Sequence, residues 1–208
     1  MSRSRFFTRV FAVLNKLCGI LVVAVLGMPL TLVAEETQPV GPRDIKHRVL
    51  GLFSADRVDD LHKVVNSLSS TSPVKIVSAD FDHAEVVFNY DPDQLYGKTE
   101  PAKYAERFDN VIGNASRRTF GILPLSELTD DKLEKVEIPI FGLDCKGCSY
   151  AAYISVYRVE GVERAQASFK DKRLTAWIDP AKTNRVALEE LLKQRGVDLN
   201  QPAAEPAK

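Results

Sequence analysis

The sequence predicts an α+β protein with two tandem ferredoxin-like units, each a βαββαβ sandwich with two helices on one face of an antiparallel sheet. The first observation behind this fold class is a repeat: Gly51-Leu52 recurs as Gly142-Leu143, and Asp91-Pro92 recurs as Asp179-Pro180. The second is that apolar patterns in both copies follow the order strand, helix, strand, strand, helix, with room for a last strand. Self-similarity of this kind indicates two copies of one structural unit.

The first copy is predicted over residues 46–125. A strand leads to Gly51, and the later segments alternate between helical and strand patterns. In order, they are a helix over 55–68, a hairpin over 74–90, an extra loop over 93–100, a second helix over 101–115 and a last strand within 120–125. This copy contains no cysteine, so we expect a degenerate partner that packs, docks or orients.

The second copy is predicted over residues 136–200. A short apolar strand over 136–141 enters a glycine turn, and a helix follows in which Ala152 and Val156 recur at helical spacing until Gly161 ends it. The remaining elements are a hairpin within 162–179, a helix over 184–196 whose inward residues are Val186, Leu188, Leu191 and Leu192, and a closing edge strand over 197–199.

Polar segments connect and follow the two copies. Residues 126–135 (SELTDDKLEK) form a charged linker, and residues 201–208 form a disordered tail. Each copy alone has a small core, so packing the two copies together would stabilise both.

Charge is distributed unevenly along the chain. Lys and Arg total 28, equal to Asp and Glu, but Arg3, Arg5, Arg9 and Lys16 all precede the first acid, Glu35. The rest of the chain therefore has 24 basic and 28 acidic side chains, a net charge of −4. Because no concentrated basic face is present, nucleic acid is excluded as a partner.

Residues 1–34 are predicted to be a signal peptide or a membrane anchor. A basic start precedes the uncharged apolar run over 17–34, and basic residues stay in the cytoplasm while such a run enters the membrane. Leu32 and Ala34 match a cleavage site weakly, and the 18 residues of the run are just enough to span a bilayer. We therefore expect the rest of the chain to be exported, periplasmic or extracytoplasmic, and membrane-anchored if the leader is not cleaved.

The stretch FGLDCKGCSYAAYISV, residues 141–156, contains the pair Cys145-x-x-Cys148 where a strand turns into a helix. Soft thiolates bind Cu(I), Zn(II), Hg(II) and similar ions. The N–H groups and the dipole at a helix start stabilise an anion, which lowers the pKa of a thiol there. A closed structural zinc site needs four ligands, and every histidine lies in the first copy. Two cysteines alone therefore indicate a carrier or a sensor site.

The second copy resembles the heavy-metal-associated (HMA) domain of periplasmic mercury-binding proteins, copper chaperones and the amino-terminal extensions of metal-pumping ATPases. The matching motifs are GLDCKGC after a strand, EGV after the first helix, IDP at the end of the third strand and LLKQRG closing the second helix. The resemblance covers residues 135–200. It implies that Cys145 and Cys148 bind a soft metal ion for capture, transfer or sensing, with a membrane metal transporter or another metal carrier as partner.

Asp144 directly precedes Cys145 and is a candidate third ligand. A carboxylate is harder than a thiolate and would move the preference toward Zn(II); in the resembled family an acid here occurs in zinc- and cadmium-handling members. The alternative is a helix N-cap or a solvated turn residue. Leu143 stands where the family usually has Met, and Val197 where copper chaperones tend to have Lys, so the identity of the ion stays open.

The first copy offers no soft-metal site. By alignment, Ser54 and Arg57 occupy the two cysteine positions, and a hydroxyl and a guanidinium supply no thiolate. Asp82, His62 and His83 lie in different elements without ligand spacing, so a solvated surface is predicted there.

Other functions are compatible with a C-x-x-C pair. An extracytoplasmic thiol–disulfide oxidoreductase is one, but thioredoxin-like proteins need a longer βαβαββα unit, and the segment after Cys148 is too short for it. A structural disulfide would close a very short ring and contribute only about 2 kcal/mol, and a non-catalytic interaction module is the third. No catalytic triad, phosphate loop or carboxylate pair stands in a recognisable context, so we do not expect an enzyme.

Overall fold

The computed structural model describes residues 41–68, 73–143 and 145–200. The predicted leader and the predicted tail lie outside the described residues, and so does Asp144. None of the described helices is long and apolar enough to cross a membrane.

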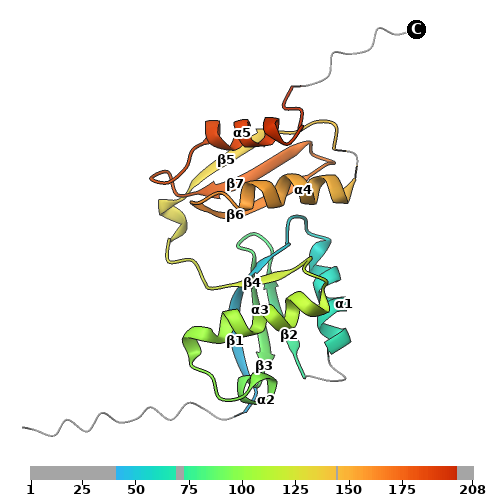
Figure 1. Ribbon diagram of the computed structural model, residues 1–208, viewed down its shortest axis with the longest axis vertical. Coiled ribbons are helices and arrows are strands. Elements are labelled where there is room, and N and C mark those ends of the chain that lie inside the picture. Colours follow the sequence, from blue (N-terminus) through green and yellow to red (C-terminus); the bar gives the residue numbers. More distant parts are fainter. Residues whose placement is uncertain (1–40, 69–72, 144, 201–208) are drawn as a thin grey trace, which may run out of the picture. The chain divides into compact units, whose positions relative to one another are not determined.

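Four antiparallel strands form the sheet of the first copy, in the order β2-β3-β1-β4 (Figure 1). The strands are β1 (Arg43–Leu50), β2 (Lys75–Asp80), β3 (Glu85–Tyr90) and β4 (Gly121–Leu123). The main helices, which pack on this sheet and against each other, are α1 (Arg57–Leu68) and α3 (Tyr104–Ala115). This connectivity and strand order are those of the ferredoxin-like sandwich, as the sequence predicts.

Strand alternation directs every second side chain of the first sheet toward the helices. On β3, Val86, Phe88 and Tyr90 are buried, and the residues between them are partly exposed. The Phe108 ring from α3 stacks on Tyr90 at a centroid distance of 4.4 Å and meets Phe88 edge-on at 4.9 Å. Burying a side chain of this size contributes roughly 1.5–3 kcal/mol, so this aromatic cluster holds α3 on the sheet.

One histidine lies inside the same core. His47 on β1 is 4% exposed, and its Nε2 atom lies 2.9 Å from the hydroxyl oxygen of Tyr90. Burial lowers the pKa of His47 to about 4, because desolvation disfavours the charged imidazolium. The side chain is therefore neutral at pH 7.

The connection between β3 and α3 contains more structure than the extra loop predicted over 93–100. A short helix, α2 (Pro92–Tyr96), follows Asp91, whose carboxylate accepts hydrogen bonds from two N–H groups of the first turn. A 3₁₀ turn, η1 (Pro101–Lys103), then leads into α3. The helix predicted over 101–115 is therefore present, with a 3₁₀ first turn that begins at a proline and an α-helix from Tyr104.

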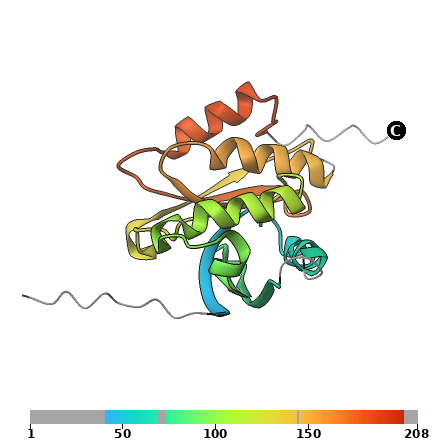
Figure 2. The ribbon, with the colours of Figure 1, turned by 60° about the horizontal axis from the view of Figure 1, so that its bottom comes forward.

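Three antiparallel strands form the sheet of the second copy, in the order β5-β7-β6 (Figure 1). The strands are β5 (Glu134–Pro139), β6 (Val162–Ser168) and β7 (Arg173–Ile178), and a 3₁₀ turn, η2 (Asp130–Lys132), precedes them. The helices, which pack on the sheet and lie side by side in Figure 2, are α4 (Lys146–Tyr157) and α5 (Arg185–Gln194). The βαββα order again follows the prediction.

The closing strand predicted over 197–199 is reduced to one bridge, between Phe141 and Asp198. The N–H of Phe141 donates to the C=O of Asp198 at 2.7 Å. The N–H of Val197 instead donates to the C=O of Leu192 at 3.0 Å and so closes the C-terminal end of α5. The pairing does not extend past this bridge, because Pro139 of β5 has no N–H and the N–H of Asn200 donates to the carboxylate of Asp198 at 2.8 Å. The second sheet therefore has three strands and a bridge rather than four strands.

The core of the second copy uses one face of α5. Leu188 and Leu192, one turn apart, are fully buried, and Leu191 is partly buried. Val186, which we predicted to face inward, is 70% exposed. Positions 186 and 188 differ by about 200° around a helix, so both cannot face the same sheet.

The two copies meet at the loop after β1, residues 51–57, which we call the first loop. Phe53 of this loop is 4% exposed and belongs to the apolar core of the second copy. Its C=O accepts a hydrogen bond from the N–H of Ala167 on β6 at 2.9 Å. Both copies therefore belong to one compact unit.

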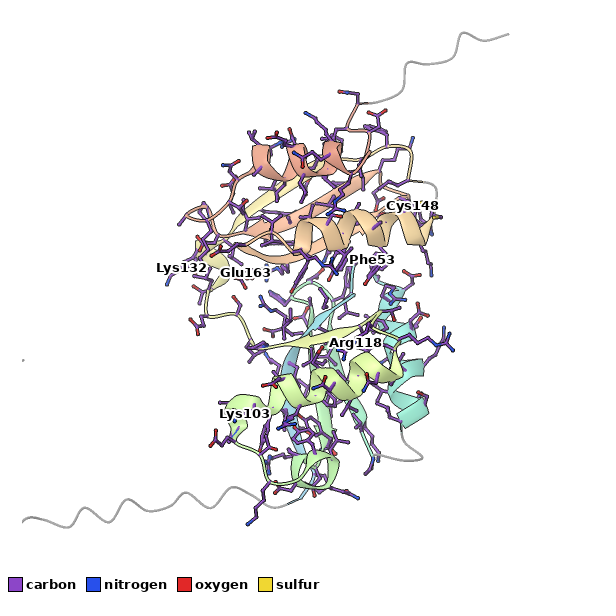
Figure 3. The ribbon with its side chains drawn as sticks, viewed as in Figure 1. Phe53, Lys103, Arg118, Lys132, Cys148 and Glu163 are labelled. Carbon is purple, nitrogen blue, oxygen red and sulfur yellow. The ribbon has the colours of Figure 1, made fainter. Side chains whose placement is uncertain are left out.

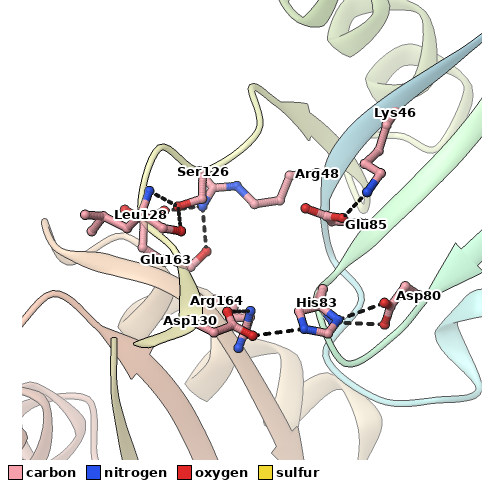
Figure 4. A network of polar contacts seen from close by, with 10 residues as sticks. All are labelled: Lys46, Arg48, Asp80, His83, Glu85, Ser126, Leu128, Asp130, Glu163 and Arg164. Carbon is pink, nitrogen blue, oxygen red and sulfur yellow. Dashed lines mark hydrogen bonds and ion pairs between the residues drawn. The ribbon is translucent and has the colours of Figure 1, made fainter. Parts of the chain in front are cut away.

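Polar contacts join the copies at a second place (Figure 4). Arg48 on β1 pairs with the carboxylate of Glu163 on β6 and donates to its C=O at 2.9 Å. Near the linker, Asp130 of η2 accepts a hydrogen bond from Arg164 at 2.8 Å and lies 3.0 Å from the Nε2 atom of His83. Asp130 therefore connects the hairpin of the first copy with the sheet of the second.

Candidate metal-binding site

The Cys145-x-x-Cys148 pair lies where the chain passes from β5 into α4, in the segment 142–148 that we call the cysteine turn. Gly142 has a φ of 70°, a left-handed conformation that glycine adopts without steric cost. Cys145 has extended backbone angles and is the N-cap of α4, and Cys148 lies in the first turn of that helix. Figure 3 shows Cys148 at the N-terminal end of α4. The local sequence thus brings both cysteines to one helix end.

The two sulfur atoms converge. The Sγ atoms are 2.7 Å apart, and the backbone N–H of Cys148 donates to the Sγ of Cys145 at 3.2 Å. This distance between the sulfur atoms exceeds the bond of about 2.05 Å that joins those of a disulfide. Cys145 is exposed and Cys148 is half-buried, so an ion can reach the pair from solvent.

This donor set fits a thiophilic cation. Two thiolates bound at about 2.3 Å to one tetrahedral Zn(II) ion are about 3.8 Å apart, so the sulfur atoms would separate by about 1 Å on binding. The N–H groups and the dipole at the start of α4 stabilise the negative charge of the thiolates. The exposure of the turn leaves room for ligands from another molecule.

Apolar residues support the turn. Leu143, which stands where the resembled family usually has Met, packs against the core of the second copy. Val197 is 8% exposed and is a core residue of the same cluster. A groove of about 580 Å³ between α4 and α5 is lined by Leu143, Cys148 and Val197, and also by Arg158 and Arg195.

No second metal site accompanies the cysteines within the part of the chain that the structure describes, where no group of three or more His, Cys, Asp or Glu side chains could hold an ion. Asp144 lies outside that part, so its role as a third ligand stays a prediction. The Nδ1 atom of His83 lies 2.7 Å from the Oδ2 atom of Asp80. The hydrogen bond with Asp80, and a weaker one with Asp130, raise the pKa of His83. His62 is exposed on α1.

The first copy has a different turn at the equivalent position. Counted from the glycine that ends the strand, Ser54 and Arg57 take the cysteine positions, as the alignment predicts. Counted back from the first helical residue, Asp56 takes the place of Cys145, and Asp59 that of the second cysteine. The two counts differ because the first helix begins six positions after Gly51 in the first copy but only four positions after Gly142 in the second.

Arg57 stabilises the first loop. Its guanidinium lies 4.2 Å from the ring centroid of Phe120. It donates hydrogen bonds to the C=O of Gly51 at 3.2 Å and to the carboxylate of Asp60 at 2.8 Å. These contacts fix the loop on its own copy and supply no metal ligand.

A lysine between the two cysteines contacts the first copy. The ammonium of Lys146 forms an ion pair with the carboxylate of Asp56. The hydrogen bond with Lys146 lowers the pKa of Asp56, and the same contact raises the pKa of Lys146. Our sequence reasoning missed this pair, because no motif or spacing connects a residue of one copy with a residue of the other.

Comparisons with known proteins return structures only. No protein-family model and no curated protein matches the sequence. One similar solved structure is the water-soluble region of the P-type ATPase CopA from Bacillus subtilis, with 16% identity over 82% of this chain and 100% of that chain, at a TM-score of 0.31. A second is oxidized MerP from Ralstonia metallidurans CH34, with 22% identity over 33% of this chain and 99% of that chain, at a TM-score of 0.31. A third is the apo N-terminal domain of the zinc(II) ATPase ZiaA, with 25% identity over 36% of this chain and 72% of that chain, at a TM-score of 0.30. The ferredoxin-like fold of both copies follows from the element order and strand order described above.

Proposed function

We propose that this protein binds one soft heavy-metal ion, such as Cu(I), Zn(II) or Hg(II), through the thiolates of Cys145 and Cys148. The observation that carries the proposal is the convergence of the two sulfur atoms, 2.7 Å apart, at an exposed turn that opens α4. The ion is cargo to be captured, transferred or sensed, and the protein is not an enzyme. The resemblance of the cysteine turn to that of HMA domains supports the same conclusion.

A site with only two thiolates can transfer its ion to another protein. Two ligands leave the coordination of the ion incomplete, whereas a structural zinc site is closed by four. Thiolates of a partner can therefore bind the ion before Cys145 and Cys148 release it. A carboxylate from Asp144 as third ligand would favour Zn(II) over Cu(I).

The proposed partner is a membrane metal transporter or another metal carrier, met outside the cytoplasm. The support for this location is the basic and then apolar pattern of residues 1–34. If that segment is kept, it anchors the protein beside a membrane transporter.

Anaerobic titration of the reduced full-length protein with Cu(I), Zn(II) and Hg(II), followed by native mass spectrometry, tests the proposal. We expect one equivalent of at least one of these ions. The variant C145S/C148S should bind none, because both thiolates are lost. Cys18→Ser is the matched control: it removes the remaining cysteine of the chain and should leave the stoichiometry at one.

The same experiment separates this proposal from a thiol–disulfide oxidoreductase, which the convergent thiols also permit. The order β5-α4-β6-β7-α5 differs from the βαβαββα unit of thioredoxin-like proteins. An oxidoreductase would reduce a small disulfide substrate catalytically and take up no ion stoichiometrically. That pair of results would contradict metal carriage, and a protein with neither property would be an interaction module.

A further inference from the structure

We propose that Asp56 of the first copy is a positioning residue for the cysteine turn: through its ion pair with Lys146 it fixes the first turn of α4, where both sulfur atoms lie. The inference rests on the proposed function, since it concerns how the metal-binding turn is held. It assigns to the copy without cysteines a role in the chemistry of the copy that has them.

The position of Lys146 makes the contact specific to the metal site. Lys146 is the first residue of α4 and directly follows Cys145. Its ammonium pairs with a carboxylate oxygen of Asp56, with 59% of the Lys146 side chain and 46% of the Asp56 side chain exposed. Solvent screens an ion pair that is exposed to this degree, so its contribution to the stability of the whole fold is small. Its effect is on the geometry of the turn.

The carboxylate is held in place from the side of the first loop. The hydroxyl of Ser54 donates a hydrogen bond to the Oδ1 atom of Asp56 at 2.6 Å. Phe53, three positions before Asp56, is buried in the core of the second copy and accepts a backbone hydrogen bond from Ala167. Asp56 therefore projects from a loop whose neighbouring residue is already fixed on the second copy.

The first loop also contacts α4 along its side. The N–H of Gly51 donates to the hydroxyl of Tyr153 at 2.9 Å, and Tyr153 is 1% exposed on α4. The ring of Phe53, labelled beside α4 in Figure 3, lies 5.7 Å from the ring of Tyr150 and 5.6 Å from that of Tyr153. The loop is thus attached to the helix at its side and, through Asp56, at its N-terminal end.

Attachment at these two places restrains the end of a helix that would otherwise fray. Helix termini open more easily than helix interiors, and an open first turn separates Cys145 from Cys148. Metal binding would then have to order the two thiolates, and the entropy lost in doing so would weaken the binding. Asp56 also holds the positive charge of Lys146, which would otherwise compete with a cationic cargo for the thiolates.

Asp56→Asn tests the inference because it keeps the side-chain size and removes the charge. In the reduced, metal-free full-length protein we expect amide hydrogen exchange at Cys148 and Ser149 to become about three- to fivefold faster, as for the loss of an exposed ion pair. In the Cu(I)-loaded protein, transfer of the ion to a chelator should accelerate by a similar factor. Asp56→Glu keeps the carboxylate and should restore both rates.

The decisive comparison uses the Lys146→Gln background. If Asp56 acts through Lys146, Asp56→Asn has no further effect there. Asp59→Asn, which removes a neighbouring carboxylate from α1, is the matched control and should change neither rate. Unchanged exchange in Asp56→Asn, or an undiminished effect in the Lys146→Gln background, would overturn the inference. The exchange measurement needs no metal, so a wild-type protein that binds no ion contradicts the proposed function alone.

Discussion

The first loop and the cysteine turn occupy the same place in two copies of one fold, between the first strand and the first helix. The cysteine turn presents an exposed Cys145 beside a half-buried Cys148. The first loop instead places Phe53 in the core of the neighbouring copy and Asp56 against the neighbouring turn. The difference teaches that the fold supplies only a position, and that the side chains placed there decide between holding an ion and holding a neighbour.

The two glycines of the repeat show the same divergence. Both have positive φ, 99° at Gly51 and 70° at Gly142. A Cβ atom added to Gly51 would lie 2.3 Å from the C=O oxygen of Thr119, whereas one added to Gly142 would meet nothing within 4 Å. Gly51 is therefore required by close packing as well as by its backbone angle, and Gly142 by its backbone angle alone.

The variant with the largest expected effect introduces two cysteines into the first copy, at positions equivalent to those of the cysteine turn. Asp56→Cys/Asp59→Cys places two thiols in the register that Cys145 and the second cysteine have relative to their helix. We expect the bound metal to rise from one equivalent to two, measured by native mass spectrometry. Ser54→Cys/Arg57→Cys, in the register counted from the glycine, is the control and should stay at one equivalent. The reverse pattern would show that the glycine sets the register.

A smaller effect tests the docking of the first loop on the second copy. Phe53→Ala removes a 4% exposed aromatic side chain from that core. We expect a loss of roughly 3–5 kcal/mol in the free energy of unfolding, measured by urea denaturation with the fluorescence of Trp177 on β7 as the probe. Val186→Ala, at a site that is 70% exposed, should change it by less than about 0.5 kcal/mol. Equal values for the two variants would contradict the docking.

A pH titration distinguishes the cores of the two copies, because only the first contains a histidine. The pKa of His47 is about 4 in the folded protein and 6.5 without the fold. Between these values the unfolded chain binds the additional proton, so stability falls as pH falls from 6.5 to 4. The expected loss is roughly 3 kcal/mol, measured by urea denaturation at pH 7 and pH 4.

His47→Gln should remove most of this pH dependence, because glutamine keeps a polar group beside Tyr90 and does not titrate in this range. His62→Gln replaces an exposed histidine of α1 and should keep the wild-type pH dependence. An identical acid loss in both variants would mean that His47 is not the titrating group.

Local patterns predicted the order of the elements, and each error has its own physical cause. The alternation in β3 and the turn spacing of Leu188 and Leu192 are intrinsic to a strand and a helix, so the sequence alone shows them. The predicted closing strand of the second copy is only one bridge, because Pro139 of β5 has no N–H and Asn200 donates its own N–H to the carboxylate of Asp198. The prediction that Val186 faces inward was wrong, because α5 has more apolar residues than one face can bury and only packing selects among them.

The sequence by itself determined that two cysteines lie at the start of a helix, since Gly142 and the C-x-x-C spacing act within one turn of chain. It also determined that the first copy has no thiols to offer. Only the tertiary structure decided how that copy contacts the second: Phe53 packs in the core of the second copy, and Asp56 forms an ion pair with Lys146. The physical reason is range. Turns and helix starts depend on neighbours a few residues away, whereas an ion pair across two folded copies depends on how their surfaces fit.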